Sequence, residues 1–345
     1  MRRAGPGHEF ELEVLSGLLD RARDELARLG YPGSRPLSRE TASFRAEGPL
    51  RRISSRLARA RLAVAFHLVL TFDVPRPRAL LGDEHSRRLL DAIDAVRASG
   101  GHSGFRFSAA GTDSTVFRRL ADLIERHTGL GESPDGELLI RVRRQRSGAW
   151  QVLLRLFPRP LSARSWRHCN AEGGLNATIA AAMNDMLLQE PPPADPVYLN
   201  AMCGTGTLLA EWCSRVPHGQ AAGFDLNGSI LACAADNLRH CRSAPELFTA
   251  DATAVPRPDS SCHFITCDPP WGDDIGTHET NAQLYPAFLR EARRLLLPGG
   301  LLVMVSHELK LLQRVLQGGT GFAVREELRV WHGGHHPGIW LLEKR

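Results

Sequence analysis

Long apolar runs, an amino-terminal hydrophobic segment and paired cysteines are all missing from this sequence of 345 residues. No stretch approaches the roughly 20 apolar residues of a membrane-spanning helix. Residues 1–13 lack the apolar core of a secretory signal. The seven cysteines form no CxxC pair and show no spacing typical of disulfides. We therefore expect a protein of a reduced, cytoplasmic compartment, without disulfides or membrane insertion.

Lysine is also nearly absent, since Lys310 and Lys344 are the only two, and arginine carries almost all of the positive charge. Residues 1–167 contain 30 Arg against 19 Asp and Glu, whereas residues 168–345 contain 13 Lys and Arg against 19 Asp and Glu. An arginine-rich genome explains the choice of arginine over lysine, but not this skew between the halves. Arginine makes forked contacts with phosphate, so the basic half is predicted to hold a nucleic acid beside a chemical half.

The two halves also differ in their pattern of predicted elements. The first half mixes amphipathic helices with short strands, which indicates α+β layers; the helices are expected at 11–29, 50–60, 80–98 and 117–128, and the strands at 43–45, 62–72, 105–107, 138–142 and 150–157. A helix at 176–188 and a proline-dense boundary at 190–196 follow.

After this boundary, strands and helices alternate regularly. The expected strands are 197–200, 221–225, 246–249, 263–267 and 301–306, and the expected helices are 208–215, 229–240 and 284–297, with a closing hairpin at 322–330 and 339–342. Such alternation predicts an α/β fold, with an open, doubly wound, mostly parallel sheet covered by helices on both faces.

A glycine turn at residues 200–207 lies between the first strand and the first helix of this sheet. Gly204 and Gly206 permit a tight turn that approaches a ligand closely, but position 209 is leucine, where a dinucleotide fingerprint has its third glycine. This favours a nucleoside cofactor without phosphates and disfavours a nicotinamide oxidoreductase. Asp225 ends the second strand, where it can bind both ribose hydroxyls, and Asp251 follows the third strand, within reach of an adenine amino group.

The motif Asp268-Pro269-Pro270-Trp271 follows the fourth strand. A carboxylate beside an acceptor carbonyl can accept both N–H groups of an exocyclic amine, and an indole can stack on the ring that carries it. The four residues alone are equally consistent with a structural Pro-Pro turn. Their order after the glycine turn and the two acids favours the chemical interpretation.

With these motifs, residues 195–345 resemble the S-adenosylmethionine-dependent methyltransferases that modify exocyclic amino groups. The resemblance implies a cofactor site formed by Asn200, Met202, Cys203, Gly204, Gly206, Thr207, Asp225 and Asp251. It implies a catalytic site in which Asp268 and the Pro269 carbonyl hold the target nitrogen and Trp271 stacks on the base. The family usually has an acid at position 200, so Asn200 implies weaker ordering of the cofactor.

The amino-terminal half resembles the THUMP-containing RNA methyltransferases. Similar residues stand in order at Gly17-Leu18-Leu19, Asp24-Glu25-Leu26, 161–167, Leu175-Asn176 and 180–183. The resemblance implies four segments: an amino-terminal α+β segment (1–60), a THUMP-like RNA-binding domain (61–167), a helical linker (168–194) and a Rossmann-like methyltransferase domain (195–345). It also implies guanosine N2-methylation of tRNA; adenine N6-methylation, or RNA binding without catalysis, remains an alternative. No obligatory protein partner is expected.

Three further groups have open roles. Arg164, Trp166 and Arg167 are candidate RNA contacts, with an internal Arg–Trp packing pair as the alternative. The histidines at 332, 335 and 336 lack nearby cysteine or acidic partners, so no metal site is predicted and a substrate-facing loop is favoured. Cys203 is interpreted as a small residue that fits the glycine turn rather than as a reactive thiol.

Overall fold

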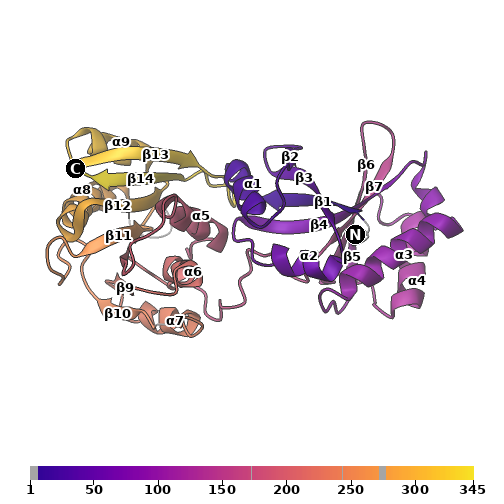
Figure 1. The fold of residues 1–345 in the computed structure, drawn as a ribbon, viewed down its shortest axis with the longest axis horizontal. Helices are drawn as coiled ribbons and strands as arrows, with labels where there is room; N and C mark the ends of the chain where they lie inside the picture. Colours follow the sequence, from indigo (N-terminus) through magenta and orange to yellow (C-terminus); the bar gives the residue numbers. More distant parts are fainter. Residues whose placement is uncertain (1–6, 172, 243, 272–276) are drawn as a thin grey trace, which may run out of the picture. The chain divides into compact units, whose positions relative to one another are not determined.

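The computed structural model describes residues 7–171, 173–242, 244–271 and 277–345 (Figure 1). Contacts group the chain into two compact units, Met1–Ser162 and Ala163–Arg345. No helix among the described residues combines the length and apolar character needed to cross a membrane.

The first unit is built on one mixed sheet, which in the described residues has seven strands in the order β2-β3-β1-β4-β7-β6-β5. Its pairs are antiparallel except for β5 with β6. The strands are β1 (Gly7–Val14), β2 (Arg35–Pro36), β3 (Thr41–Glu47), β4 (Ala63–Phe72), β5 (Phe105–Ser108), β6 (Leu138–Arg144) and β7 (Trp150–Arg155). The helices are α1 (Leu19–Arg28), α2 (Leu50–Leu57), α3 (Asp83–Arg97) and α4 (Thr115–Thr128), with a 3-10 helix at Pro77–Leu81.

The prediction of a single helix over 11–29 is wrong. The chain forms strand β1 up to Val14 and begins α1 only at Leu19. Phe10, Leu12 and Val14 are buried and alternate with glutamates, which is the two-residue period of a strand. The other predicted helices and strands of this unit are confirmed, with ends shifted by a few residues.

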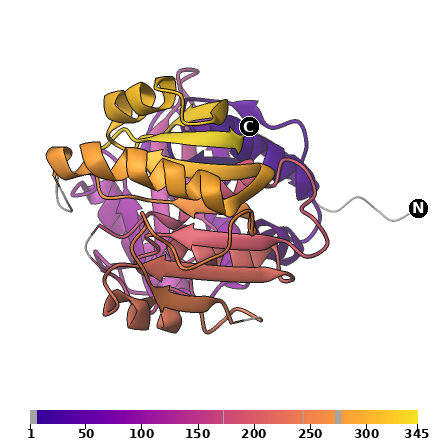
Figure 2. The same ribbon diagram turned by 90° about the vertical axis from the view of Figure 1, so that its left-hand side faces the viewer.

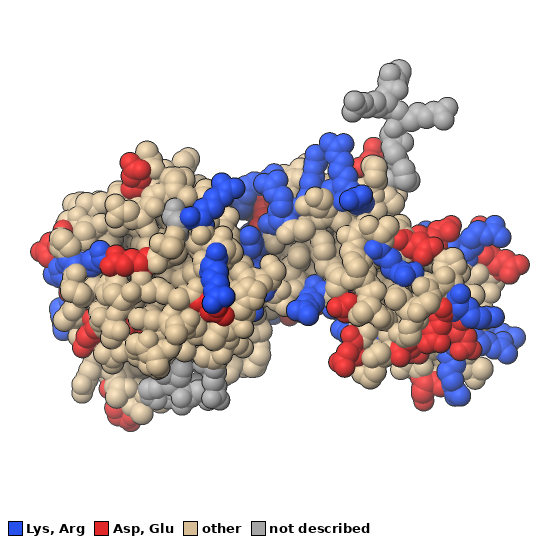
Figure 3. Space-filling view, turned by 90° about the horizontal axis from the view of Figure 1, so that it is seen from below, with Lys and Arg blue, Asp and Glu red and all other residues tan. Residues whose placement is uncertain are grey.

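Arginines of the first unit are partly neutralised within the unit. Arg143 pairs with the buried Glu11, and Arg141 lies 3.3 Å from the carboxylate of Glu13. On the face drawn in Figure 3, basic side chains are interleaved with acidic ones toward the end that carries α3 and α4. Toward that end of this face, acidic side chains therefore offset part of the positive charge, and the arginines do not form one continuous patch there.

The second unit confirms the predicted α/β fold. Its sheet has the order β10-β9-β8-β11-β12-β14-β13, parallel except for the pairs that involve β14. The strands are β8 (Val197–Ala201), β9 (Gln220–Asp225), β10 (Glu246–Thr249), β11 (Cys262–Cys267), β12 (Leu296–Ser306), β13 (Phe322–Arg329) and β14 (Gly338–Lys344). The helices are α5 (Ala177–Leu187), α6 (Thr207–Arg215), α7 (Ile230–Asn237), α8 (His278–Leu295) and α9 (Leu309–Gln317).

Helices cover both faces of this sheet (Figure 2). On one face Tyr198 of β8 stacks on Trp212 of α6, with ring centroids 4.2 Å apart. On the other face Leu199 and Ile265 share a buried cluster with Phe288 of α8. Successive residues of a strand point to opposite faces, so strands covered on both sides are apolar throughout. Helix α9 was not predicted.

The contacts do not divide the chain at the proline-dense boundary. Helix α5 precedes that boundary, yet it packs on α6 and on strands of the second sheet and is buried along its whole length. Residues 168–194 are therefore part of the second unit rather than a separate linker. In the first unit, β1 and β3 share one sheet with β4, across the expected boundary at residue 60.

The expectation of no disulfide is also wrong. Cys169 and Cys233 are bonded, at a sequence separation of 64. Asn237 fixes the same segment, since its Oδ1 accepts the backbone N–H groups of His168 and Cys169 at 2.8 and 2.9 Å. Tertiary packing of the segment before α5 on α7 brings the two cysteines together, and sequence spacing does not reveal this.

Cys233→Ser should destabilise the protein by about 2–4 kcal/mol under non-reducing conditions, because the bond restricts the unfolded chain. Urea unfolding with and without dithiothreitol measures the difference. In dithiothreitol the variant and the wild type should have nearly equal midpoints. Equal midpoints without reductant would show that the bond does not stabilise the fold.

Candidate active site

The candidate active site lies where the strand order of the second sheet reverses. β8 and β11 are adjacent and parallel, with Ala201 beside Cys267. The chain then continues from β8 to β9 on one side and from β11 to β12 on the other. The loops after β8 and β11 therefore diverge and leave a crevice at the carboxyl ends of the strands, where open α/β sheets bind ligands.

The glycine turn after β8 is tied to β9. The Cys203 N–H donates to the Phe224 carbonyl at 2.8 Å, and the Gly206 N–H donates to the Cys203 carbonyl at 2.8 Å. Met202 and Gly204 both have φ of 50°; this left-handed conformation is costly for methionine, and such strain clusters at functional sites. A Cβ added to Gly204 would meet no protein atom within 4 Å, so the turn faces open space.

Gly206 does not line the cavity described below. Its missing side chain allows the turn to pack closely against α7. Its φ is 76°, and a Cβ there would lie 3.2 Å from the Cβ of Ala234 on α7. This differs from its expected place around the cofactor. Gly223 on β9 has a similar role, because a Cβ there would lie 2.4 Å from Cδ1 of Leu209. These two glycines let the turn and α6 lie close to their neighbours.

Two carboxylates follow the next strands. Asp225 accepts the Gly204 N–H at 2.9 Å on Oδ2 and the Asn227 N–H at 3.0 Å on Oδ1. It therefore braces the glycine turn directly. Asp251 accepts the backbone N–H and the hydroxyl of Thr253 on Oδ1, and these bonds hold the pKa of its carboxyl below the usual value.

Asp268 directly follows β11 at the reversal point, and it lines the same cavity as the glycine turn. The indole Nε1–H of Trp271 donates to its Oδ1 at 3.0 Å, which leaves Oδ2 as the oxygen not held by the indole. Enclosure by protein raises the pKa of the Asp268 carboxyl to about 7, and the bond from Trp271 opposes part of the rise. The carboxyl can therefore exchange a proton near neutral pH.

Two side chains of helix α8 hold the Pro-Pro turn through hydrogen bonds to the Pro270 carbonyl. Asn281 Nδ2 donates to the Pro270 carbonyl at 2.9 Å, and the Tyr285 hydroxyl donates to the same oxygen at 3.1 Å. The Tyr285 oxygen also lies 2.8 Å from the hydroxyl of Ser306, at the end of β12. The sequence analysis missed both side chains of α8, because nothing in the spacing connects them with residue 270.

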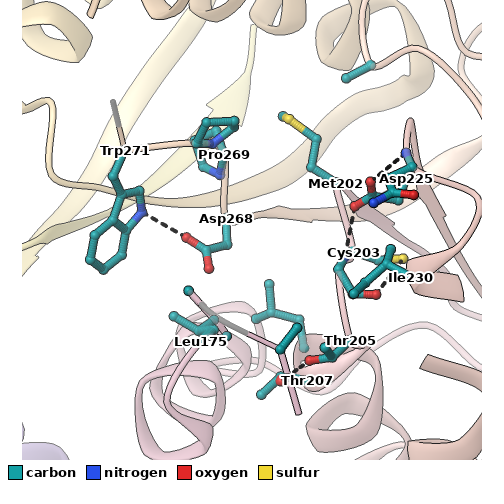
Figure 4. A pocket seen from close by; sticks show the side chains of 18 of the residues that line it. Leu175, Met202, Cys203, Thr205, Thr207, Asp225, Ile230, Asp268, Pro269 and Trp271 are labelled. Atoms are coloured by element: carbon teal, nitrogen blue, oxygen red, sulfur yellow. Dashed lines mark hydrogen bonds between the residues drawn. The ribbon is translucent and has the colours of Figure 1, made fainter. Parts of the chain in front are cut away.

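A cavity of about 750 Å³ joins these loops (Figure 4). Among the predicted residues, its wall contains Met202, Cys203, Gly204, Thr207, Asp225, Asp251, Asp268, Pro269, Pro270 and Trp271. It also contains residues that were not predicted, among them Leu175, Asn176, Ile179, Ile230 and Leu284. His332 and His335, from the loop expected to face the substrate, line it as well. The cavity therefore brings the glycine turn, the acid after β9 and the acid after β11 into one space.

Asn200 was predicted in the cofactor site but does not line the cavity. It is buried on β8, and its Nδ2 donates to the carbonyls of Thr266 and Ala201 at 3.2 and 3.3 Å. Its Oδ1 has no hydrogen-bond partner among the described residues. Asn200 thus ties β8 to β11 beneath the site.

The raised pKa of Asp268 predicts that stability depends on pH. An unfolded aspartate ionises near pH 4, whereas the folded one holds its proton to about pH 7, so wild-type stability falls between these values and then levels off. Asp268→Asn removes this loss. The free energy of unfolding of this variant, measured with urea, should exceed that of the wild type only slightly at about pH 4 and by a few kcal/mol at most at about pH 8. Solvent in the cavity limits the difference at the higher pH. A gain that shrinks as the pH rises would contradict the assignment.

The three candidate RNA contacts, Arg164, Trp166 and Arg167, pack against other residues of the second unit. Arg164 is buried and lies 2.7 Å from the buried carboxylate of Glu211. Trp166 is buried and stacks on His240, with ring centroids 5.9 Å apart. Arg167 donates to the Leu175 carbonyl and to the Thr207 hydroxyl at 2.8 and 2.9 Å. The packing alternative is therefore correct for these residues, and they stabilise the cavity wall.

Arg164→Ala should lower the free energy of unfolding by about 3–5 kcal/mol, because it leaves the charge of Glu211 buried without this partner. Arg239→Ala is the matched control; its side chain is 79% exposed and pairs with Asp236 on the surface, so it should change stability by less than about 1 kcal/mol. Urea unfolding measures both. Equal effects of the two variants would contradict the buried role.

The remaining candidates are the Cys203 thiol and a metal site. Burial raises the pKa of the Cys203 thiol to about 12, with Asp225 adding to the rise. The thiol is therefore protonated, as expected of a residue that packs in the turn. In the part of the chain that the structure describes, no group of three or more His, Cys, Asp or Glu side chains is arranged to hold a metal ion.

The comparisons with known proteins agree with this geometry. Residues 164–338 match the family model described as UPF0020, the RMKL-like methyltransferase domain. The chain belongs to this family. The match covers the glycine turn, the three carboxylates and the Pro-Pro motif, and it begins almost where the second unit begins.

Relatives extend the similarity over the first unit. A tRNA (guanine(6)-N2)-methyltransferase of Thermus thermophilus is 31% identical over 355 residues, which cover 97% of this chain and 99% of that protein. The crystal structure of TrmN from Thermus thermophilus has a TM-score of 0.76 at 26% identity and covers 98% of this chain and all of that one. The mouse tRNA (guanine(6)-N(2))-methyltransferase THUMP3 is 30% identical over 186 residues, and the matched part is only 36% of its length.

Proposed function

We propose that this chain transfers a methyl group from S-adenosylmethionine to the exocyclic N2 of a guanosine in tRNA. The observation that carries the proposal is the shared cavity. It places the Asp268 carboxyl at the end of β11 in the same space as the glycine turn and Asp225. The whole-length similarity to a tRNA guanine-N2 methyltransferase supports the choice of nitrogen and RNA.

The residues present fit this cofactor. The turn at Gly204 faces open space that a Cβ would enter, and the cavity is within the usual size range of small-molecule sites. Met202 and Gly204 would hold the amino-acid part, Asp225 the ribose and Asp251 the adenine. When bound, the cofactor supplies an electrophilic methyl group on a sulfonium.

The protein's part in the reaction is to position and polarise the amine. Asp268 Oδ2 would accept one N–H of guanine N2, and the Pro269 carbonyl would accept the other. These bonds weaken the delocalisation of the nitrogen lone pair into the ring and direct it toward the methyl carbon. With a pKa near 7, Asp268 can also take the proton that the nitrogen loses after transfer.

Trp271 has a second role besides the expected stacking on the base. Its N–H fixes the Asp268 carboxylate, so the indole orients the acceptor as well as offering a ring to the base. Taking the guanine out of its stack costs a few kcal/mol, which stacking on the indole would partly offset.

For RNA binding, we propose the THUMP-like first unit, Met1–Ser162, in which the segments expected at 1–60 and from 61 onward share one sheet. Its support is the excess of arginine in this half of the chain. Because the expected substrate is tRNA, we propose a cytoplasmic location. The Cys169–Cys233 bond is unusual for a reducing compartment, and the comparison with dithiothreitol above tests its importance there.

Mass spectrometry of nucleosides tests the proposed function. Unmodified tRNA is incubated with the protein and isotope-labelled S-adenosylmethionine, then digested. We expect labelled N2-methylguanosine. Labelled N6-methyladenosine would select the adenine alternative, and cofactor binding without any labelled nucleoside would contradict catalysis on tRNA.

A further inference from the structure

Three aromatic side chains meet beside Asp268. The ring of Trp271 stacks on His307, with centroids 5.5 Å apart and planes inclined by 30°. His335 meets the indole edge-on, at 5.9 Å and 64°, and lies 5.0 Å from His307. The two histidines thus contact the indole from different directions.

Both histidines are held by the backbone. His307 directly follows β12, the strand next to β11. The His336 N–H donates to Nε2 of His307 at 3.1 Å, so a backbone group fixes the orientation of this ring. His335 lies in a tight turn closed by reciprocal backbone bonds with His332, both 3.0 Å long.

The turn needs the two glycines between these histidines. Gly333 and Gly334 have φ of 59° and 83°, a conformation that other residues rarely adopt. Asn176, which caps α5, lies 3.3 Å from the ring of His332. The loop between β13 and β14 is therefore anchored on the cavity wall at Asn176 and on the indole at the other end.

We propose that His307 and His335 are positioning residues for methyl transfer. They hold the indole of Trp271 so that its N–H fixes Oδ1 of Asp268, while Oδ2 is presented to the amine. This inference rests on the proposed function of the site. An indole without these neighbours could rotate about its side-chain bonds, and the carboxylate would lose its fixed direction.

Replacing either histidine should lower kcat rather than weaken binding of tRNA or cofactor. Small displacements of a reacting group lower rates strongly, whereas neither histidine is among the residues proposed to bind the cofactor. His307→Ala should lower kcat about 10-fold or more, with KM for tRNA and Kd for S-adenosylmethionine changed less than about twofold. His307→Phe keeps a ring against the indole and should restore most of kcat.

His335→Ala is the second variant. His335 lies on an exposed loop, so its side chain can be removed without disturbing the core. It should also lower kcat, by less than His307→Ala. His218→Ala, an exposed histidine of another loop, is the matched control and should behave as the wild type.

A readout without catalysis separates this inference from the proposed function. The emission of Trp271 is obtained by subtracting the spectrum of Trp271→Phe from that of the wild type, and the same pair is made in the His307→Ala background. We expect the spectrum to shift when His307 is removed. An unchanged spectrum, or kcat within twofold of the wild type in both His307→Ala and His335→Ala, would overturn the positioning role. A wild-type protein that modifies no tRNA would contradict the proposed function alone. The Trp271 emission spectra would still show whether His307 fixes the environment of the indole.

Discussion

Asp268→Ala lowers kcat for methyl transfer by about 100- to 1,000-fold, the usual loss when one preorganised electrostatic contact is removed from a transition state. The carboxylate is the acceptor that would hold the amine, and its raised pKa lets it take up a proton near pH 7. Asp268→Asn keeps the size of the side chain but loses its charge, so it should be almost as inactive. Initial rates with labelled cofactor measure both variants.

The fold and the cofactor site should survive these changes. Asp268 is outside the group proposed to bind the cofactor, so calorimetry should give a Kd for S-adenosylmethionine within about threefold of the wild type. Asp195→Asn, at an exposed position, is the matched control and should retain full activity. Activity of Asp268→Ala within tenfold of the wild type would remove Asp268 from the catalytic site.

Asp225→Ala should weaken binding of S-adenosylmethionine by about 100-fold or more. The substitution removes the proposed ribose acceptor and also the bond to the Gly204 N–H at 2.9 Å that holds the glycine turn. Hydrogen bonds to charged groups contribute about 1.5–3 kcal/mol each, and a factor of 100 corresponds to about 2.7 kcal/mol.

Titration calorimetry measures this directly on the free protein. Asp225→Asn keeps one acceptor oxygen and should fall between the wild type and the alanine variant. Asp195→Asn again serves as the control. A Kd for Asp225→Ala within threefold of the wild type would show that the cofactor does not bind at the end of β9.

The second unit could be predicted well because its elements have strong local signals. Parallel strands that are buried on both faces appear in the sequence as short apolar runs. Asp225 is the last residue of one such strand, and Gly204 and Asp268 come shortly after two others. Carboxyl ends of parallel strands share one edge of a sheet, so the order of these residues was enough to predict that they meet. The cavity that contains all three bears out this reasoning about their location.

The failures share a different cause. For Arg164 and Trp166 the sequence left RNA contact and internal packing open, and the structure shows packing, since Glu211 pairs with Arg164 and His240 stacks on Trp166. The Cys169–Cys233 bond and the Asn281 contact with Pro270 join residues that are distant in the chain. Such pairs are set by packing of elements, which local patterns do not encode.

In the first unit, the misassigned segment shows a competing periodicity. Residues 15–29 carry apolar residues at helical spacing, and extending that pattern backwards to residue 11 overrode the alternation of Phe10, Leu12 and Val14. The pairing of β1 with both β3 and β4 decides the conformation, because a central strand satisfies its backbone groups on both sides.

The most direct test of the account is a crystal structure of this protein with S-adenosylhomocysteine. We predict the ribose hydroxyls on the Asp225 carboxylate, the amino-acid part against Gly204 and the sulfur directed toward Asp268. A ligand bound elsewhere, or a sulfur pointing away from Asp268, would contradict the claim that donor and acceptor meet at the end of β11.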